Sequence, residues 1–101
     1  MVAPVYHVRM TPRALADLTG IFEYIKQDSP QNAAKMIRTL VDAIDSLETF
    51  PHRYNVPRGL KTSSRQYRSM PVERYLIRYR IDEPRGAVHI MRVRHGARRN
   101  P

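Results

Sequence analysis

The sequence predicts an α+β fold of two layers, in which a helical hairpin packs on one face of a mostly antiparallel four-stranded sheet. Three observations lead to this prediction. Two adjacent segments repeat apolar residues at the spacing of a helix face, one short strand-like segment precedes them, and three strand-like segments follow them. The predicted order is therefore β-α-α-β-β-β, in a single domain over residues 1–101.

The first half of the chain predicts one strand and two helices. Residues 5–10 are β-branched and aromatic and precede Thr11-Pro12, which suits a strand followed by an N-cap and a Pro at the first helical position. The first helix is expected from about Pro12 to about Gln27. The second begins with the same pattern at Ser29-Pro30 and is expected to run to about Thr49. A connection this short predicts an antiparallel helical hairpin.

The second half predicts a loop and three strands. Pro, Gly and Ser residues mark a loop over about residues 51–64, and its length is typical of a functional or mobile segment. Strands are expected over residues 65–70, 74–81 and 87–94. A tight turn at residues 82–86 joins the last two into an antiparallel hairpin.

Alternation along the last two strands predicts which side chains share a face. On the 74–81 strand, Arg78 and Arg80 lie on the face opposite Ile77 and Tyr79. The last strand is less regular, with Ala87, Met91 and Val93 on one face and Val88, Ile90, Arg92 and Arg94 on the other. We expect the Arg side chains of both strands to form a basic platform on the side away from the helices.

The composition is that of one folded domain. The chain has 101 residues, of which 42% are hydrophobic and 27% are charged, and this suffices for one modest core. It contains no Cys, which excludes disulfides, thiolate zinc sites and a Cys nucleophile. No long apolar run and no signal-peptide pattern occur. We therefore expect a soluble, cytoplasmic protein without a membrane partner.

The positive charge is concentrated in the second half of the chain. Residues 1–50 have a formal charge of −1 and residues 51–101 one of +10, for a total of +9. Fifteen of the eighteen basic residues are Arg, whose planar group binds phosphates and carboxylates bidentately. We therefore expect an acidic partner, which is nucleic acid, an acidic protein or a nucleic-acid-bound machine. A general solubilising charge is the alternative.

The candidate binding residues lie on the predicted platform and beside it. They are Tyr67, Arg68, Arg78, Arg80, Arg92, Arg94, His95 and Arg98. The alternative is that each strand Arg pairs with a neighbouring acid.

Motifs for catalysis are scarce, since no phosphate-binding loop, zinc-protease pattern or nucleophile motif occurs. No metal and no cofactor are predicted. The one reaction that such a surface could perform is cleavage of RNA by its own 2′-hydroxyl. Arg68 would then stabilise the developing charge and His95 would transfer protons, with Tyr67 nearby.

Several segments resemble the RelE/ParE superfamily of toxins from bacterial toxin–antitoxin operons. They are TPRALADL at 11–18, IFEYI at 21–25, LETFP at 47–51, YLIRY at 75–79 and RVRHGAR at 92–98. The ParE branch, the plasmid stabilisation toxins, is the more similar. The resemblance implies a small growth-inhibiting toxin that acts on DNA gyrase without an agreed catalytic site. It also implies a cognate, ParD-like antitoxin that holds the toxin inactive in a hetero-oligomer.

RelE-like members of the superfamily instead cut messenger RNA in the ribosomal A site. Arg68 and His95 are the positions at which this sequence is similar to their catalytic residues, whereas the loop holds one Lys, Lys61, and no Tyr follows His95. Three functions therefore stay open. They are a gyrase-binding toxin, a ribosome-dependent mRNA endonuclease and a nucleic-acid-binding module that needs no antitoxin.

Overall fold

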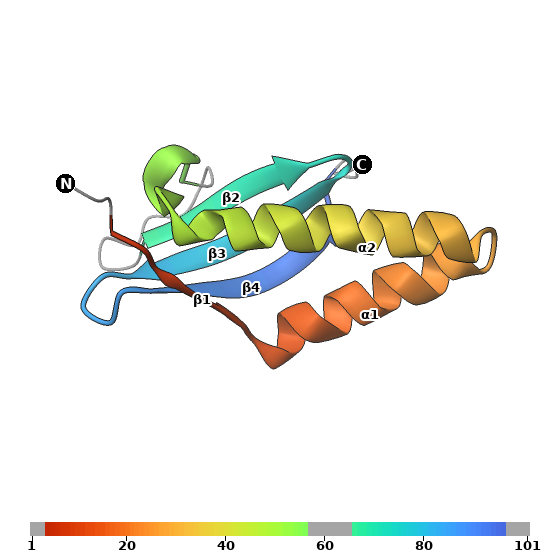
Figure 1. Cartoon of the computed structure of the whole chain (residues 1–101), viewed down its shortest axis with the longest axis horizontal. Helices are drawn as coiled ribbons and strands as arrows, with labels where there is room; N and C mark the ends of the chain where they lie inside the picture. The colour runs from red at the N-terminus through yellow and green to blue at the C-terminus, as the bar shows by residue number, and fades with distance from the viewer. Residues whose placement is uncertain (1–3, 57–65, 97–101) are drawn as a thin grey trace.

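The computed structural model describes residues 4–56 and 66–96 and has both helices on one face of a four-stranded sheet (Figure 1). The elements are β1 (His7–Met10), α1 (Pro12–Lys26), α2 (Pro30–Asp45), β2 (Gln66–Val72), β3 (Tyr75–Asp82) and β4 (Ala87–His95). The predicted fold class and element order are confirmed. Residues 57–65, most of the predicted loop, lie outside the described residues.

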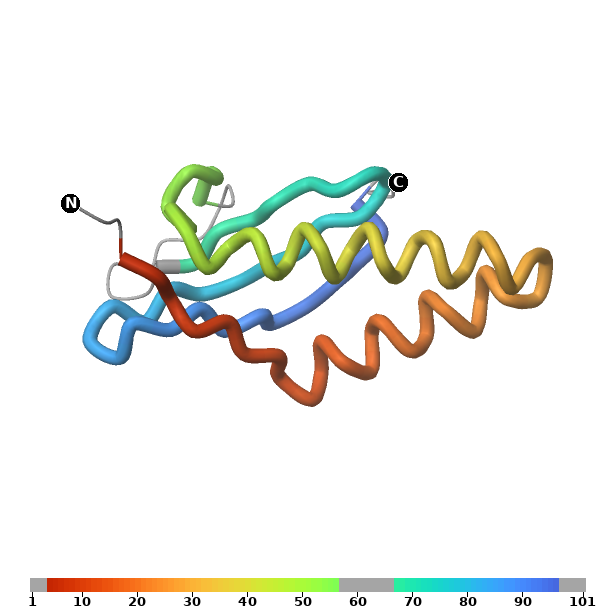
Figure 2. The backbone as a smooth tube through the Cα atoms, in the orientation of Figure 1, coloured from red at the N-terminus to blue at the C-terminus, as the bar shows by residue number. Residues whose placement is uncertain are grey.

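Both helices begin where the sequence predicts. The side-chain oxygens of Thr11 and Ser29 accept the backbone N–H groups of Ala14 and Asn32, each at 3.1 Å, and a Pro follows each cap. The hairpin extends beyond the end of the sheet (Figure 2).

The second helix ends earlier than predicted, at Asp45, and continues as a 3-10 turn over Ser46–Glu48. The Arg53 side chain caps this end, because its guanidinium donates to the carbonyl oxygens of Thr49 at 2.6 Å and Phe50 at 3.0 Å. Another terminal nitrogen of Arg53 donates to the Ser46 hydroxyl oxygen at 3.0 Å, so this side chain connects the end of α2 to the segment that follows it.

The sheet has the order β1-β4-β3-β2, with β1 parallel to β4 and the other pairs antiparallel. Strand β1 pairs only with the first part of β4, because the chain leaves the sheet at Thr11, whose hydroxyl donates to the Ile90 carbonyl at 2.7 Å. Beyond Ile90, the edge of β4 that faces away from β3 therefore has α1 beside it instead of a strand.

The core lies between the hairpin and the inner face of the sheet. Its largest fully buried side chains are Tyr79, Leu40, Leu47, Met70, Ile77, Ile90 and Val88. The Tyr79 hydroxyl donates to the Pro51 carbonyl, and burial raises the pKa of Tyr79 to about 12. Leu18 and Ile44 are buried in the same cluster, as the helical spacing predicts.

A β-bulge in β4 makes the predicted division of that strand wrong. Arg78 is opposite Arg92, but the next residue, Tyr79, is opposite Ile90, so Met91 is an extra residue. The extra residue reverses the alternation, and Val88, Ile90 and Val93 all lie in the core. Val88 and Ile90 therefore do not share a face with Arg92 and Arg94. Alternation alone contains no signal for such an insertion.

Candidate functional site

Arginines gather on the outer face of the sheet, away from α1 and α2. The pairing forms rows across this face. The first row is Tyr67, Arg80, His89 and Arg9, the second is Ser69, Arg78 and Arg92, and the third is Pro71, Leu76 and Arg94. Arg9, Arg78 and Arg94 are exposed and Arg80 is half-buried. We call these four arginines the basic face.

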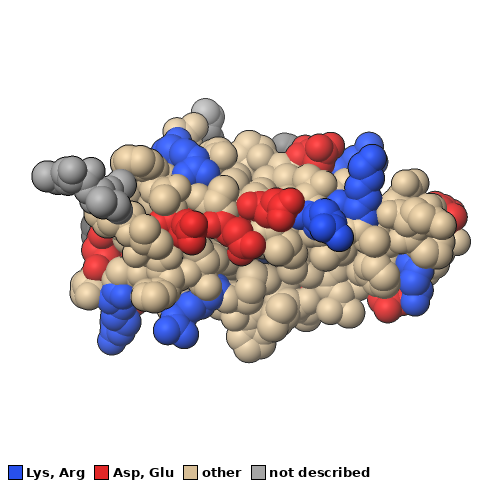
Figure 3. Space-filling model, in the orientation of Figure 1, with Lys and Arg blue, Asp and Glu red and all other residues tan. Residues whose placement is uncertain are grey.

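Arg9 belongs to this face although it is not among the binding residues predicted from the sequence. It lies in the half of the chain that carries no excess charge, and only the parallel pairing of β1 with β4 brings it beside His89. The sequences of β3 and β4 contain no pattern that predicts Arg9 as their neighbour. The helix layer on the other side of the molecule carries acidic and basic side chains together (Figure 3).

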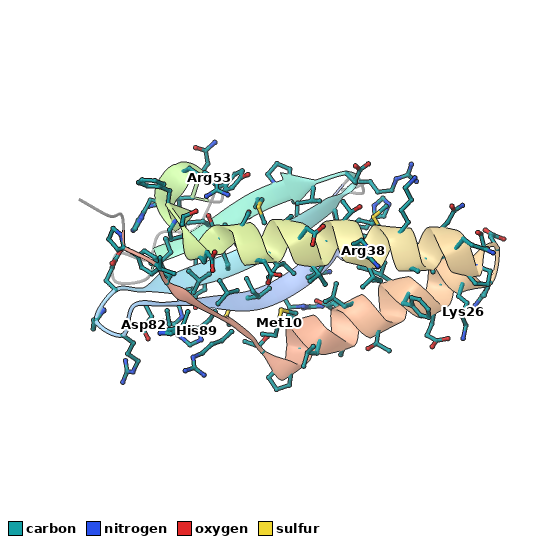
Figure 4. The ribbon with its side chains drawn as sticks, in the orientation of Figure 1. Met10, Lys26, Arg38, Arg53, Asp82 and His89 are labelled. Carbon is teal, nitrogen blue, oxygen red and sulfur yellow. The ribbon has the colours of Figure 1, made fainter. Side chains whose placement is uncertain are left out.

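The one acidic residue within β2, β3 and β4, Asp82, lies at the end of the basic face. Its Oδ2 atom is 3.5 Å from His89 Nε2 and 3.4 Å from an Arg85 nitrogen (Figure 4). Burial raises the pKa of Asp82, but the charge of Arg85, a backbone hydrogen bond and His89 outweigh it, so the net pKa is lowered. Asp82 thus stays ionised and interacts with His89 and Arg85.

Arg92 is held by an acid from α1. Its Nε donates to Asp17 Oδ2 at 2.9 Å and a terminal nitrogen donates to Oδ1 at 3.2 Å. The same carboxylate accepts the Val93 N–H at 2.8 Å. Burial raises the pKa of Asp17, but the hydrogen bonds from Arg92 and the Val93 N–H and the positive charge of Arg92 outweigh it and lower the pKa overall. The structure therefore shows Arg92 in an ion pair with an acidic residue, which is the alternative that the sequence left open for the strand arginines.

Arg68 lies on the inner face and not on the predicted platform. It is opposite the buried Tyr79, whereas its neighbour Tyr67 is opposite Arg80. A terminal nitrogen of Arg68 donates to the carbonyl oxygens of Tyr54 at 2.9 Å and His52 at 3.4 Å. Arg68, which was expected beside the platform of Arg78 and Arg80, lies on the opposite face of the sheet, because alternate residues of a strand point to opposite faces. Arg68 instead holds the segment after α2 against the sheet.

His95 lines a cleft between the hairpin and the end of the sheet. Its ring meets the Tyr75 ring edge-on, with ring centres 5.4 Å apart. The cleft has a volume of about 810 Å³, and its lining includes Tyr24, Lys35, Met36, Arg74, Tyr75 and His95. We call it the tip cleft.

Gly96 closes the strand end beside this cleft. Its N–H donates to the Arg74 carbonyl at 2.8 Å. A Cβ atom at this position would lie 2.7 Å from Leu76 Cγ, so the close approach suits a glycine.

The structure does not bring Arg68 and His95 together. Arg68 is opposite Tyr79 on one side of β3, and His95 is opposite Tyr75 on the other. Four residues along a strand correspond to roughly 13 Å, and two strand spacings add roughly 10 Å across the sheet. One phosphate group therefore could not contact the Arg68 and His95 side chains together, as a catalytic pair requires.

Arg98, a predicted binding residue, and Lys61 of the predicted loop lie outside the described residues. Within residues 4–56 and 66–96, no group of three His, Asp or Glu side chains could hold a metal ion. In the same ranges, neither helix is long and apolar enough to cross a membrane.

Residues 8–100 match the sequence profile of a family described as "ParE toxin of type II toxin-antitoxin system, parDE". Toxin RelE2 of Caulobacter vibrioides is 43% identical over 88 residues, which cover 87% of this chain and 92% of that protein. A solved chain of the chromosomal ParDE system from P. aeruginosa shares the fold, with a TM-score of 0.73 and 19% identity over 92% of this chain and 98% of that one.

A second solved chain belongs to the toxin–antitoxin complex RelBE2 from Mycobacterium tuberculosis. Its TM-score is 0.62 and its identity 29%, over 93% of this chain and 94% of that one. The family profile, the relative and the two solved chains therefore all concern toxins or toxin–antitoxin systems.

Proposed function

The chain belongs to the ParE toxin family of type II toxin–antitoxin systems, within the RelE/ParE superfamily, and we propose that it inhibits growth by binding DNA gyrase until a cognate antitoxin neutralises it. The observation that carries this proposal is the separation of Arg68 from His95. General acid–base catalysis requires groups positioned together at the reacting phosphate, and these two residues lie four positions apart along the sheet and on either side of β3. This arrangement favours a binding protein over a ribonuclease.

The neighbours of Arg68 also support this proposal. Its guanidinium donates to two backbone carbonyl groups, those of Tyr54 and His52. Catalysis by electrostatic stabilisation requires a guanidinium directed at the reacting group. The Arg68 side chain is directed at the polypeptide itself, which is typical of a structural role.

The predicted binding residues divide between two surfaces. Tyr67, Arg78, Arg80 and Arg94 lie on the outer face of the sheet. His95 lies in the tip cleft, which is assigned to the antitoxin. Arg92, through its pair with Asp17, and Arg68 act as structural supports in this proposal.

The tip cleft offers chemistry that suits an amphipathic acidic segment of an antitoxin. Tyr24, Met36 and Tyr75 provide apolar contacts, while Lys35 and Arg74 provide positive charge in the same lining. Tyr24 is 75% exposed, which leaves a large aromatic surface for a partner to cover. Aromatic and apolar anchors supply most of the affinity in protein interfaces, and charge complementarity raises the association rate.

Two assays on one preparation test the proposed target. We expect the purified chain to inhibit supercoiling by DNA gyrase and to leave messenger RNA on programmed ribosomes uncut, and the antitoxin to restore supercoiling. Codon-specific cleavage that is lost in His95→Gln and Arg68→Ala, but kept in the His7→Gln control, would contradict the proposal. That result would identify a ribosome-dependent endonuclease instead.

A further inference from the structure

The charges of the two layers differ in a way that gives the molecule two unlike sides. Arg9, Arg78, Arg80 and Arg94 come from three strands and share the outer face. Exposed carboxylates lie instead on the helix layer and the turn after it, at Asp42, Asp45 and Glu48, and Figure 3 shows acidic side chains on that side. The basic face therefore presents a concentrated positive potential, which attracts a polyanion in one orientation.

The distribution of apolar side chains favours nucleic acid over protein as the partner of the basic face. The exposed large hydrophobic residues among those described are Val5, Leu15, Tyr24, Val41, Phe50 and Val56. None of them lies in β2, β3 or β4. Protein interfaces depend on a few large apolar or aromatic anchors, whereas protein–DNA interfaces are polar and strongly positive.

The aromatic content of the basic face favours a duplex over a single strand. Proteins that bind single strands stack successive bases on several aromatic side chains. In the described rows of this face, the one aromatic residue besides His89 is Tyr67, which is half-buried. Arginines without stacking partners contact phosphates, which a duplex displays on its outside.

The dimensions of the basic face also fit a phosphate backbone. Two strand spacings of about 4.8 Å place Arg9 roughly 10 Å from Arg80, and Arg78 lies roughly 7 Å from Arg80 along β3. A DNA duplex carries one charge per about 1.7 Å of its axis. The face can therefore contact about four phosphates at once, each with an Arg fork.

From these observations we propose that the basic face binds the phosphate backbone of double-stranded DNA without sequence preference. This inference goes beyond the proposed function, since it requires neither gyrase nor an antitoxin. Four phosphate contacts predict that the logarithm of the binding constant falls with the logarithm of salt concentration with a slope of about −3.6.

Fluorescence anisotropy with a labelled 20-base-pair duplex tests the proposal, in NaCl from 50 to 200 mM. We expect Arg78→Gln/Arg80→Gln to weaken binding at least tenfold and to reduce the size of the salt slope by about 2, since each contact contributes about 0.9. The matched control is Lys35→Gln/Arg38→Gln on α2, which removes the same charge from the helix layer. It should leave the slope nearly unchanged.

Three results would overturn the proposal. They are an equal loss of binding in the two double variants, which indicates general net charge, tighter binding of single-stranded DNA or RNA of the same length, and no duplex binding at 50 mM NaCl. If circular dichroism shows that Arg78→Gln/Arg80→Gln does not fold, Arg9→Gln/Arg94→Gln replaces it with the same expectation. Supercoiling assays play no part in this test, so its failure leaves the proposed target unaffected.

Discussion

Asp17 and Arg92 are 75 residues apart in the chain and form a bidentate ion pair at the open edge of β4. The same carboxylate accepts the Val93 N–H, which no neighbouring strand can reach because β1 ends at Met10. A side chain of α1 thus supplies the acceptor that a strand would supply. Asp17 is 16% exposed and Arg92 is 29% exposed, so solvent only partly screens the pair.

Removing the Asp17 carboxylate should destabilise the fold. Asp17→Ala leaves the Val93 N–H without its acceptor, which costs about 1–3 kcal/mol in the free energy of unfolding. Asp17→Asn keeps one oxygen for Val93 and should cost less. Urea unfolding of the parent and the two variants measures the order of their free energies of unfolding. Asp42→Ala on the exposed face of α2 is the control. If Asp17→Ala has the same free energy of unfolding as the parent, the carboxylate does not stabilise this edge.

The same carboxylate should make stability depend on acid. Because the pKa of Asp17 is lowered in the folded state, its contribution is complete above the unfolded value of about 4 and is lost as the pH falls through the folded pKa. We expect the stability difference between the parent and Asp17→Asn to shrink between pH 5 and pH 2. Other acids, including Asp82, are present in both proteins and cancel. A difference that is constant over this range would exclude the carboxylate as its cause.

The seam between the helices and the sheet should depend on its buried aliphatic residues. Leu18 is 9% exposed and Ile44 is 3% exposed, and each substitution to Ala should cost about 2–5 kcal/mol because it leaves a cavity. Val41→Ala on the same helix as Ile44 is the control, since Val41 is 37% exposed. Thermal or urea unfolding gives the comparison. Melting curves of Leu18→Ala and Ile44→Ala that overlap the parent curve would rule out this packing.

Association with the antitoxin should be sensitive to salt, given the proposed tip cleft. Lys35 and Arg74 attract an acidic segment, so the association rate should fall as NaCl rises and should fall further in Lys35→Glu/Arg74→Glu. Stopped-flow mixing with the antitoxin encoded beside this chain measures both effects. Arg9→Glu/Arg80→Glu on the basic face is the charge-matched control. A larger effect in this control would move the antitoxin to the outer face of the sheet.

Local patterns were enough to predict the elements and their order. The caps at Thr11 and Ser29, each followed by Pro, determine where the helices begin, because capping involves residues only three positions apart. Alternation in β3 correctly separated Arg78 from Ile77 and Tyr79, since no bulge interrupts that strand itself. Leu18 and Ile44 follow from helical spacing in the same way.

Only the tertiary structure decided which of these elements meet and in what register. The parallel pairing of β1 with β4 placed Arg9 on the basic face, and the bulge at Met91 reversed the second part of β4. The packing also pairs the Asp17 carboxylate with Arg92, places Arg68 on the inner face of the sheet and brings His95 into the lining of the tip cleft. Periodicity describes one segment at a time, whereas strand register and long-range ion pairs depend on how distant segments pack. The sequence by itself therefore determined the layers and the charge of the sheet, and the packing determined which arginines are structural and which form a surface.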